Sequence, residues 1–562
     1  MPATLDDQHL QDGEMIELNP RLMSSHLGLI DSPMELNACL NAHGLYNSVQ
    51  YVLRLSPEVH RRIAGLPQGI IRTDVDFDKV QAYSTYLHET IHWWQHIGST
   101  TGLMLSLSYP AQAHANYSQL RSLLQAIGPK KSILKWITTT PTAGGGPDTP
   151  RGLANIVVNT HFDIEFFRIL ATNPGIVQQV VEHSLFDSIG RSYAIAYANI
   201  LSTLATTLND PFAVITDPRG WETEFTALRD RRKTGYYYGS EVRVSPIGAH
   251  QIFEGQARFT QLQFLYFASR MGLGWDEIRA KGMLEGVYGE AFRAFLELAN
   301  LEWPSSIDHP TVALFMLVCD MAINPSAGFP MPLQAFPTFI TDTDPGMRFL
   351  FLCRVIATMR PDVVTRITRY SREEYLEVSE ALAAALLIDP PVGVAHRVAG
   401  WTEESEAIRQ LMAEYRTFAY LPENLAVRLL FSHFLAFCAD KRTRPEFFCW
   451  PGAWMAGERV SDEGSLLLDR HSAPFMDKAD DSGIYPRVMP GRNAGLVQTA
   501  FNGFYAMNVT YEMTRQWIGK AGPFEYDYGW LSSSGTAVEM KMFGDRHFEM
   551  LYGVHPDAFE II

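Results

Sequence analysis

The chain has 562 residues, of which 46% are hydrophobic and 19% are charged. These values are typical of a globular protein with two or three domains, and they exclude extensive disorder. The formal net charge of −16 disfavours a general binder of nucleic acid or of anionic membranes, because both need a basic surface. We therefore expect neither nucleic acid nor a membrane as a partner.

The cysteines and the N-terminus indicate a reducing compartment. The five cysteines are scattered and form no Cys-x-x-Cys pair, which argues against a disulfide framework and against a thiolate zinc site. The N-terminus is acidic and lacks the basic and then apolar segments of a secretory signal. The best apolar run, residues 312–319, is much shorter than the ~18 residues of a membrane-spanning helix. We expect a soluble, cytoplasmic protein.

The first elements are predicted from residue patterns and from Pro and Gly. Residues 1–69 should form an N-terminal region of short helical pieces, because prolines interrupt them repeatedly. Residues 70–77 alternate apolar and polar side chains, as an edge strand does. No Pro or Gly lies between Lys79 and Ile97, so we expect a helix there, with Asp78 as its N-cap and Gly98 as its stop or kink.

This helix carries His88-Glu89-Thr90-Ile91-His92. Histidines four residues apart lie on one face of a helix, where both can hold one metal ion, and the intervening Glu can take a proton from a metal-bound water. The alternative is a structural helix that carries two histidines by coincidence. A strand followed by a metal-bearing helix resembles the zincin metallopeptidases, and this resemblance implies a zinc site with Glu89 as general base.

His96 does not extend the motif. The metzincin pattern needs a Gly turn that brings a third His back to the metal, whereas Trp93, Trp94 and Gln95 continue the helix here. His96 would lie ~12 Å along the axis from His88, so we expect it to be a buried hydrogen-bonding residue beside the metal ligands.

Two long helices should follow a loop at residues 138–150, whose Gly and Pro content prevents regular structure. That loop is either a flap near the cleft or a surface insertion. The helices are expected at residues 152–171 and 176–208. A solvated helix face is the simpler explanation of their polar side chains, which include His161, Asp163, Glu165, Glu182 and His183.

A second candidate segment begins near Pro246 and continues as a mostly apolar helix through Phe267. It places Glu254 in an early, buried turn, where a carboxylate needs a cation. Glu254-Gly255-Gln256-Ala257 resembles the second helix of gluzincin peptidases. The resemblance implies that Glu254 is the third zinc ligand, that the small residues allow close approach of the two helices, and that the helices between them are an insertion, because Glu254 follows His92 by 162 residues.

Other residues leave alternatives open around this site. Arg258 could form an intrahelical ion pair with Glu254. His250, on the same face, and the tyrosines 236–238 are candidate donors to a transition-state oxygen, although the tyrosines could instead form a packed strand. Asp320 interrupts an apolar helix face and so needs a partner, such as a liganding imidazole. If Glu254 is no ligand, His250, His161 or Asp320 would take its place.

The expected fold is mainly α (α+β), with a zincin-like core, large helical insertions and a helical C-terminal region. We divide it into a helical region at 1–69, the metal-binding catalytic domain at 70–340 and a C-terminal domain at 341–562. Helices are expected at residues 348–359, 372–388, 402–419 and 425–438, and strands within 526–552.

The sequence predicts a zinc-dependent peptidase of the gluzincin type that acts on a protein or peptide. His88, His92 and Glu254 would hold Zn²⁺, and Glu89 would activate water. One alternative is a non-haem di-iron oxygenase, because Glu89-x-x-His92 is the half-motif of such sites, although the chain has no second copy. Another is a non-catalytic interaction protein stabilised by a metal. The sequence indicates no oligomeric state.

Overall fold

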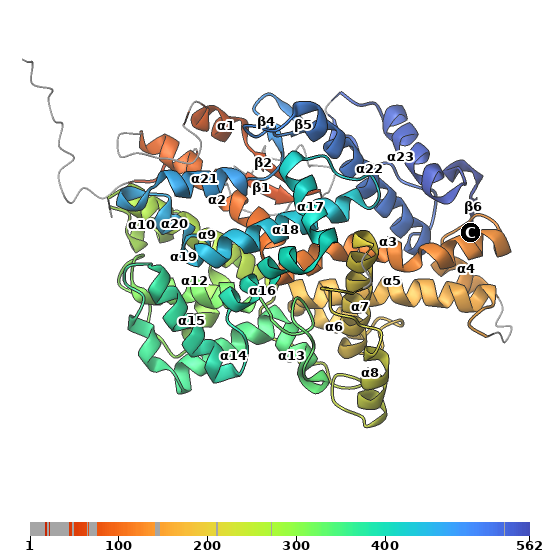
Figure 1. Ribbon diagram of the computed structural model, residues 1–562, viewed down its shortest axis with the longest axis horizontal. Helices are drawn as coiled ribbons and strands as arrows, with labels where there is room; N and C mark the ends of the chain where they lie inside the picture. The colour runs from red at the N-terminus through yellow and green to blue at the C-terminus, as the bar shows by residue number, and fades with distance from the viewer. Residues whose placement is uncertain are drawn as a thin grey trace, which may run out of the picture.

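Helices dominate the fold (Figure 1). A computed structural model of the protein describes residues 17–19, 22, 44–47, 50–64, 66, 76–140, 146–209, 212–270, 272–532 and 534–562. Helices make up most of the described residues and strands very few of them, which confirms a mainly α-helical protein.

Helix α2 (Phe77–Gly98) carries the His-Glu-x-x-His motif and is buried along most of its length. Its N-cap is Asp76, whose side chain accepts a hydrogen bond from the backbone N–H of Asp78. The predicted helix is therefore confirmed, but its predicted N-cap is wrong by two residues. The predicted strand at 70–77 lies mostly outside the described residues, and Phe77 already belongs to α2.

The end of α2 is a sharp turn into α3 (Thr100–Ile127), as the Gly98 signal predicts. Ser99 caps both helices, and its hydroxyl accepts from the N–H of Gly102 at 2.9 Å. A Cβ at Gly102 would lie 1.9 Å from the carbonyl oxygen of Gln95, so only glycine allows this turn.

Helix α9 (Ala249–Ala268) packs along α2. It also contacts α11 (Val287–Leu298) and α12 (Pro310–Ala322). A Cβ at Gly255 would lie 3.1 Å from the Cβ of Ala291 and 3.3 Å from Cζ of Phe315. Gly255 therefore permits close packing on α11 and α12, not the approach to α2 that the sequence suggests.

Further helices enclose this pair from both sides (Figure 1). Helices α3, α5 (Pro150–Thr172) and α7 (Ile189–Leu208) pack together on one side, and α18 (Leu425–Thr443) contacts α2 on another. The single helix expected at 176–208 is instead two helices, α6 (Val177–Val181) and α7, because Ser188 caps a new helix.

The strands are few and short. β1 (Gly44–Asn47) pairs antiparallel with β2 (Val52–Leu55), which runs parallel to β4 (Phe475–Lys478), and β5 (Asp481–Pro486) completes the order β1-β2-β4-β5. A second pair, β3 (Lys130–Lys131) and β6 (Glu560–Ile561), is parallel.

The strands predicted within 526–552 are wrong, because α23 (Ala537–Tyr552) occupies most of that segment. Thr536 and Glu539 form a capping box that starts this helix. The tyrosines 236–238 lie in turns rather than in a strand.

Two hydrophobic cores stabilise the described part of the protein. The larger one draws on both sides of residue 340, so packing marks no boundary there and the division into domains stays a prediction. The smaller one joins the far ends of α3 and α5 to α4 (Ile133–Thr139), α22 (Ala494–Gly519) and α23.

The helices expected in the C-terminal region are largely confirmed as α14 (Pro345–Thr358), α15 (Arg372–Leu386), α17 (Glu406–Thr417) and α18. The remaining helices are α1 (Pro57–Ile63), α8 (Trp221–Asp230), α10 (Trp275–Ala280), α13 (Phe339–Thr343), α16 (Pro391–Glu404), α19 (Pro445–Cys449), α20 (Pro451–Trp454) and α21 (Asp462–Arg470).

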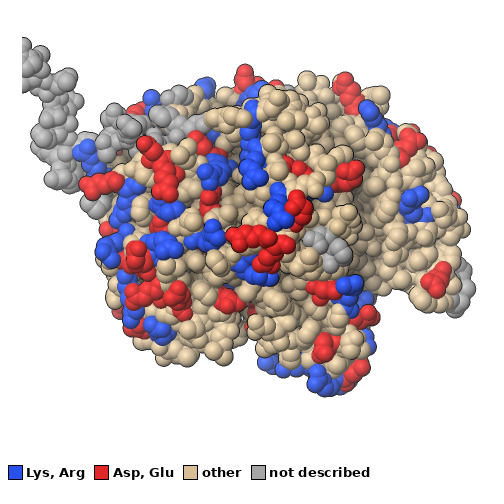
Figure 2. Space-filling view, in the orientation of Figure 1, with Lys and Arg blue, Asp and Glu red and all other residues tan. Residues whose placement is uncertain are grey.

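Among the described residues, no single helix combines the length and the apolar character needed to cross a bilayer, and α15 with α16 meets that test only as a pair bent by 97°. Acidic and basic side chains are interspersed over the face shown in Figure 2.

Candidate metal centre

The three predicted metal ligands meet in the structure. His88 and His92 project from α2 and Glu254 from α9, and one ligand atom of each lies within 4.8 Å of the others. The Nε2 atoms of the two histidines are 3.1 Å apart. Oε2 of Glu254 is 3.4 Å from Nε2 of His92 and 3.6 Å from Nε2 of His88.

These separations match the size of a zinc ion. Ligands about 2.0–2.1 Å from a tetrahedral zinc are about 3.4 Å from one another. The three measured separations, 3.1, 3.4 and 3.6 Å, lie on both sides of this value. Two imidazole nitrogens and one carboxylate oxygen are also a donor set that catalytic zinc uses, with a fourth position left open.

Burial and mutual contact shift the pKa values of the three groups. Burial lowers the pKa of His88 to about 3. Burial also disfavours the charged form of His92, but the carboxylates of Glu254 and Glu89 raise its pKa to about 9. Although burial opposes ionisation of Glu254, the two imidazoles hold its pKa well below the usual value. The site therefore stabilises one positive charge beside Glu254, which either a proton or a metal ion can supply.

Gln95 orients His92 from the next turn of α2. Nδ1 of His92 lies 2.8 Å from Oε1 of Gln95, so this contact holds a proton on Nδ1 and leaves Nε2 to face either a second proton or a metal. The amide nitrogen of Gln95 donates to the carbonyl oxygen of Phe253 and to Oε1 of Gln256, each at 2.9 Å. Gln95 therefore also connects α2 to α9. Its position three residues after His92 is the signal that could have identified it.

Glu89 lies beside the three candidate ligands and does not belong to their group. Its side chain is buried, and its charge raises the pKa values of both His92 and Tyr288. This position is compatible with action on a water molecule at the open coordination position.

Tyr288 on α11 is a site residue that the sequence does not reveal. Its ring centroid is 5.8 Å from that of His88, and the guanidinium of Arg258 stacks on its ring at 3.9 Å. Burial raises the pKa of Tyr288 to about 12, so its hydroxyl remains a donor. Arg258 also donates to Gln261, and the ion pairs of Glu254 are with the two histidines. The alternative Glu254–Arg258 pair is thus not formed.

The other candidates have other contacts. Asp320 accepts from the hydroxyl of Tyr375 at 2.7 Å and pairs with Lys441, so the suggestion that it orients a metal-bound imidazole is wrong. Oδ2 of Asp163 accepts from Arg191 at 3.0 Å, and the ring of His183 stacks on Phe162.

Several further candidates lie away from the three ligands. Tyr238 is 77% exposed, and Glu182 accepts from Gln178 on the surface. The hydroxyl of Tyr236 donates to the carbonyl oxygen of Phe336. His161, Glu165, His96 and His250 lie in or beside a pocket described below.

Within the described part of the chain, only one other cluster offers three such ligand groups: Asp545, His555 and Asp557. Lys541 pairs with both of its carboxylates, which already supplies a cation. A di-iron site needs several bridging carboxylates, whereas the group on α2 and α9 contains one.

The arrangement as a whole brings together three groups that can hold a divalent ion, with Glu89 and Tyr288 close to them. No protein-family model, curated protein or solved structure matches this chain.

Proposed function

We propose that the protein is a zinc-dependent peptidase with a gluzincin-like site in a zincin-like core. The observation that carries this proposal is the convergence of His88, His92 and Glu254 at tetrahedral-edge distances, although Glu254 is 162 residues from His92 in sequence. A helix that carried two histidines by coincidence would not require a carboxylate from a distant helix at the same point.

The residues have distinct roles in the proposed reaction. His88 and His92 bind the metal through Nε2 and Glu254 binds it through a carboxylate oxygen. Zinc, when bound, supplies Lewis acidity toward water and the peptide carbonyl. Glu89 takes the proton of the attacking water and passes it to the leaving amine, and the hydroxyl of Tyr288 donates to the carbonyl oxygen as negative charge develops on it.

The test combines metal content with peptide hydrolysis. We expect about one zinc per chain by elemental analysis of the purified protein, and loss of that zinc in His88→Ala and His92→Ala. The control His183→Ala, which removes a histidine stacked on Phe162, should keep it. Equal zinc in all four proteins would refute the site.

Glu89→Gln should keep zinc but lose hydrolysis of a proteome-derived peptide mixture by about 10²–10⁴-fold, because an amide cannot accept the proton of water. Glu182→Gln, an exposed change, is the matched control. A zinc-loaded protein that cleaves no peptide, or a fully active Glu89→Gln variant, would contradict the proposed mechanism.

A further inference from the structure

A pocket of about 370 Å³ lies one helical turn from the metal centre. His96 of α2 and His250 of α9 line it, and they follow His92 and precede Glu254, respectively, by four residues. Four helical residues span about 6 Å. Phe253, adjacent to Glu254, forms part of the wall and packs against His96, with their ring centroids 5.4 Å apart. The pocket therefore lies along the contact between α2 and α9, one helical turn away from the three candidate ligands.

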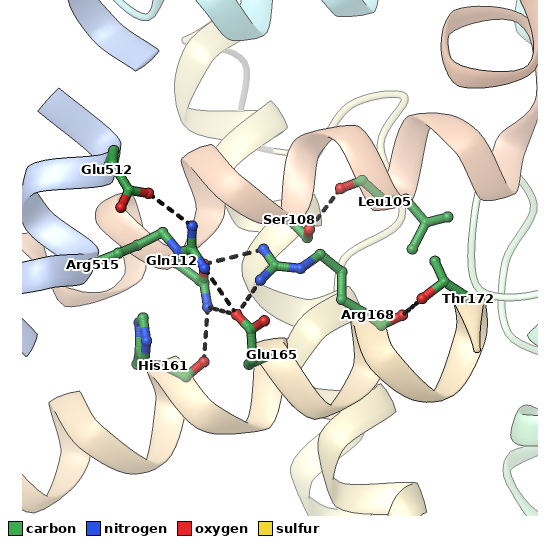
Figure 3. Close-up of polar contacts among 9 residues, drawn as sticks. All are labelled: Leu105, Ser108, Gln112, His161, Glu165, Arg168, Thr172, Glu512 and Arg515. Carbon is green, nitrogen blue, oxygen red and sulfur yellow. Dashed lines mark hydrogen bonds and ion pairs between the residues drawn. The ribbon is translucent and has the colours of Figure 1, made fainter. Parts of the chain in front are cut away.

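Arg168 of α5 is the cation that lines this pocket, and Figure 3 shows its polar contacts. It is 7% exposed, and its guanidinium stacks on the ring of Tyr109 at 3.9 Å. It donates to Oε1 of Gln112 and to Glu165. A guanidinium has five N–H donors, so these two bonds leave donors without an acceptor among the described residues.

Glu165, the carboxylate of the pocket, is already neutralised. Figure 3 shows Arg168 and Arg515 pointing toward it from opposite sides, with Gln112 donating between them. Although burial opposes ionisation, the two arginines lower the pKa of Glu165 to about 2. Glu512, which pairs with Arg515, comes from α22 on the far side of that arginine. The pocket wall therefore combines a carboxylate that is already paired with a guanidinium that has N–H donors beyond those it uses.

We propose that this pocket binds the carboxylate of an acidic substrate residue within about two positions of the bond cleaved at the metal centre. The assignment rests on the proposed peptidase function. An extended peptide advances about 3.3–3.6 Å per residue, so one or two residues cover the distance between the pocket and the three candidate ligands. The side chain of Glu or Asp would accept from the unused N–H groups of Arg168.

The same wall disfavours other side chains. A Lys or Arg side chain would meet the guanidinium of Arg168 and find no free carboxylate, because Glu165 is held by two arginines. An apolar side chain would cover buried donors without satisfying them, which is costly. The pocket should therefore bind a carboxylate side chain more tightly than the corresponding amide, and an ammonium side chain least tightly of the three.

The experiment uses alanine-based hexapeptides, blocked at both ends, with one central Glu, Gln or Lys. Their binding to zinc-loaded Glu89→Gln protein is measured by calorimetry, and their cleavage by the active protein is measured separately. A charge-assisted hydrogen bond predicts at least about tenfold tighter binding of the Glu peptide than of the Gln peptide. Arg168→Gln should abolish this ratio.

Two further variants control for folding. Arg168→Gln leaves Glu165 with fewer partners and could disturb the fold, so His250→Glu provides a second test. It adds a carboxylate at an exposed position of the pocket and should also lower the Glu-to-Gln ratio. Arg397→Gln, in a separate pocket of about 400 Å³, should leave the ratio unchanged.

The outcomes separate this proposal from the proposed function. Cleavage of all three peptides with equal affinities would overturn the subsite and leave the peptidase. Selective binding of the Glu peptide without any cleavage would support the subsite and count against the peptidase. Absence of both binding preference and cleavage would overturn both.

Discussion

Gln95 joins the two helices that carry the candidate ligands, and it orients His92 through Nδ1. Gln95→Leu should weaken zinc binding by about 10–100-fold, the usual cost of losing such an orienting contact. A competitive zinc chelator titration measures this. The control is Gln516→Leu, which removes a buried glutamine that bonds the backbone of Glu525 and belongs to neither α2 nor α9. Unchanged zinc affinity in Gln95→Leu would show that His92 needs no orienting partner.

Asp344, the N-cap of α14, is a residue whose ionisation opposes folding. Burial raises its pKa to about 6, although the hydroxyl of Tyr193 and two backbone N–H groups partly counteract this. Between about pH 4 and pH 6 the folded protein holds a proton that the unfolded chain, with a pKa of about 3.9, has released. Stability from this group is therefore full below pH 4 and is lost as the pH rises through 6.

Asp344→Asn cannot ionise, so its stability relative to the natural protein should rise between pH 4 and pH 7, by on the order of 2–3 kcal/mol. Thermal unfolding at several pH values checks this. The exposed change Asp276→Asn is the control. A difference that stays constant or falls over the same range would contradict the assignment.

At the scale of elements, the turn between α2 and α3 fixes the position of Gln95. A Cβ at Gly102 would lie 1.9 Å from the carbonyl oxygen of Gln95, so Gly102→Ala must displace one of the two helices. We expect a loss of about 1–3 kcal/mol or more in stability, as in other overpacked sites, together with weaker zinc binding. Gly220→Ala, where nothing lies within 4 Å of the added Cβ, should change neither. Intact zinc binding in Gly102→Ala would mean that the turn does not support the site.

The sequence predicts the two site helices because local signals define them: neither Pro nor Gly between Lys79 and Ile97, and a small-residue start before the apolar run that contains Glu254. It misplaces the N-cap of α2, since Asp76 and Asp78 are equally good caps in sequence. It predicts strands where α23 forms and overlooks the Thr536–Glu539 capping box, the local signal that starts this helix.

Tyr288, by contrast, has no local pattern. Its place beside His88 depends on how α11 packs against α9, which only tertiary contacts decide. The same holds for Arg168, whose pocket is made by α2, α3, α5 and α9 together. The metal-binding motif can therefore be predicted from the sequence, whereas Tyr288 and Arg168, which would contact a substrate, cannot.

At the scale of the whole molecule, α22 belongs to both hydrophobic cores. Residues such as Phe504 pack in the larger core and Trp517 in the smaller one. The C-terminal end of α22 is held by Lys131, whose buried ammonium donates to the carbonyl oxygens of Lys520, Gly522 and Pro523 at 2.9, 2.6 and 3.1 Å. One side chain from β3 therefore satisfies three backbone acceptors directly after α22, at the edge of the smaller core.

Lys131→Met should destabilise the smaller core and leave the candidate metal centre intact, because the three carbonyls lose their donor and each unsatisfied acceptor costs about 1–3 kcal/mol. Hydrogen exchange followed by mass spectrometry should show faster exchange in residues 509–524 and 537–559, with residues 77–98 unchanged and zinc content retained. Lys520→Gln, which removes only an exposed pair with Glu525, should show little effect. Three lost hydrogen bonds affect the smaller core alone only if the two cores are separately stable. Equally faster exchange in α2 and α23 would therefore contradict the prediction, because it would mean that the two cores unfold as one unit.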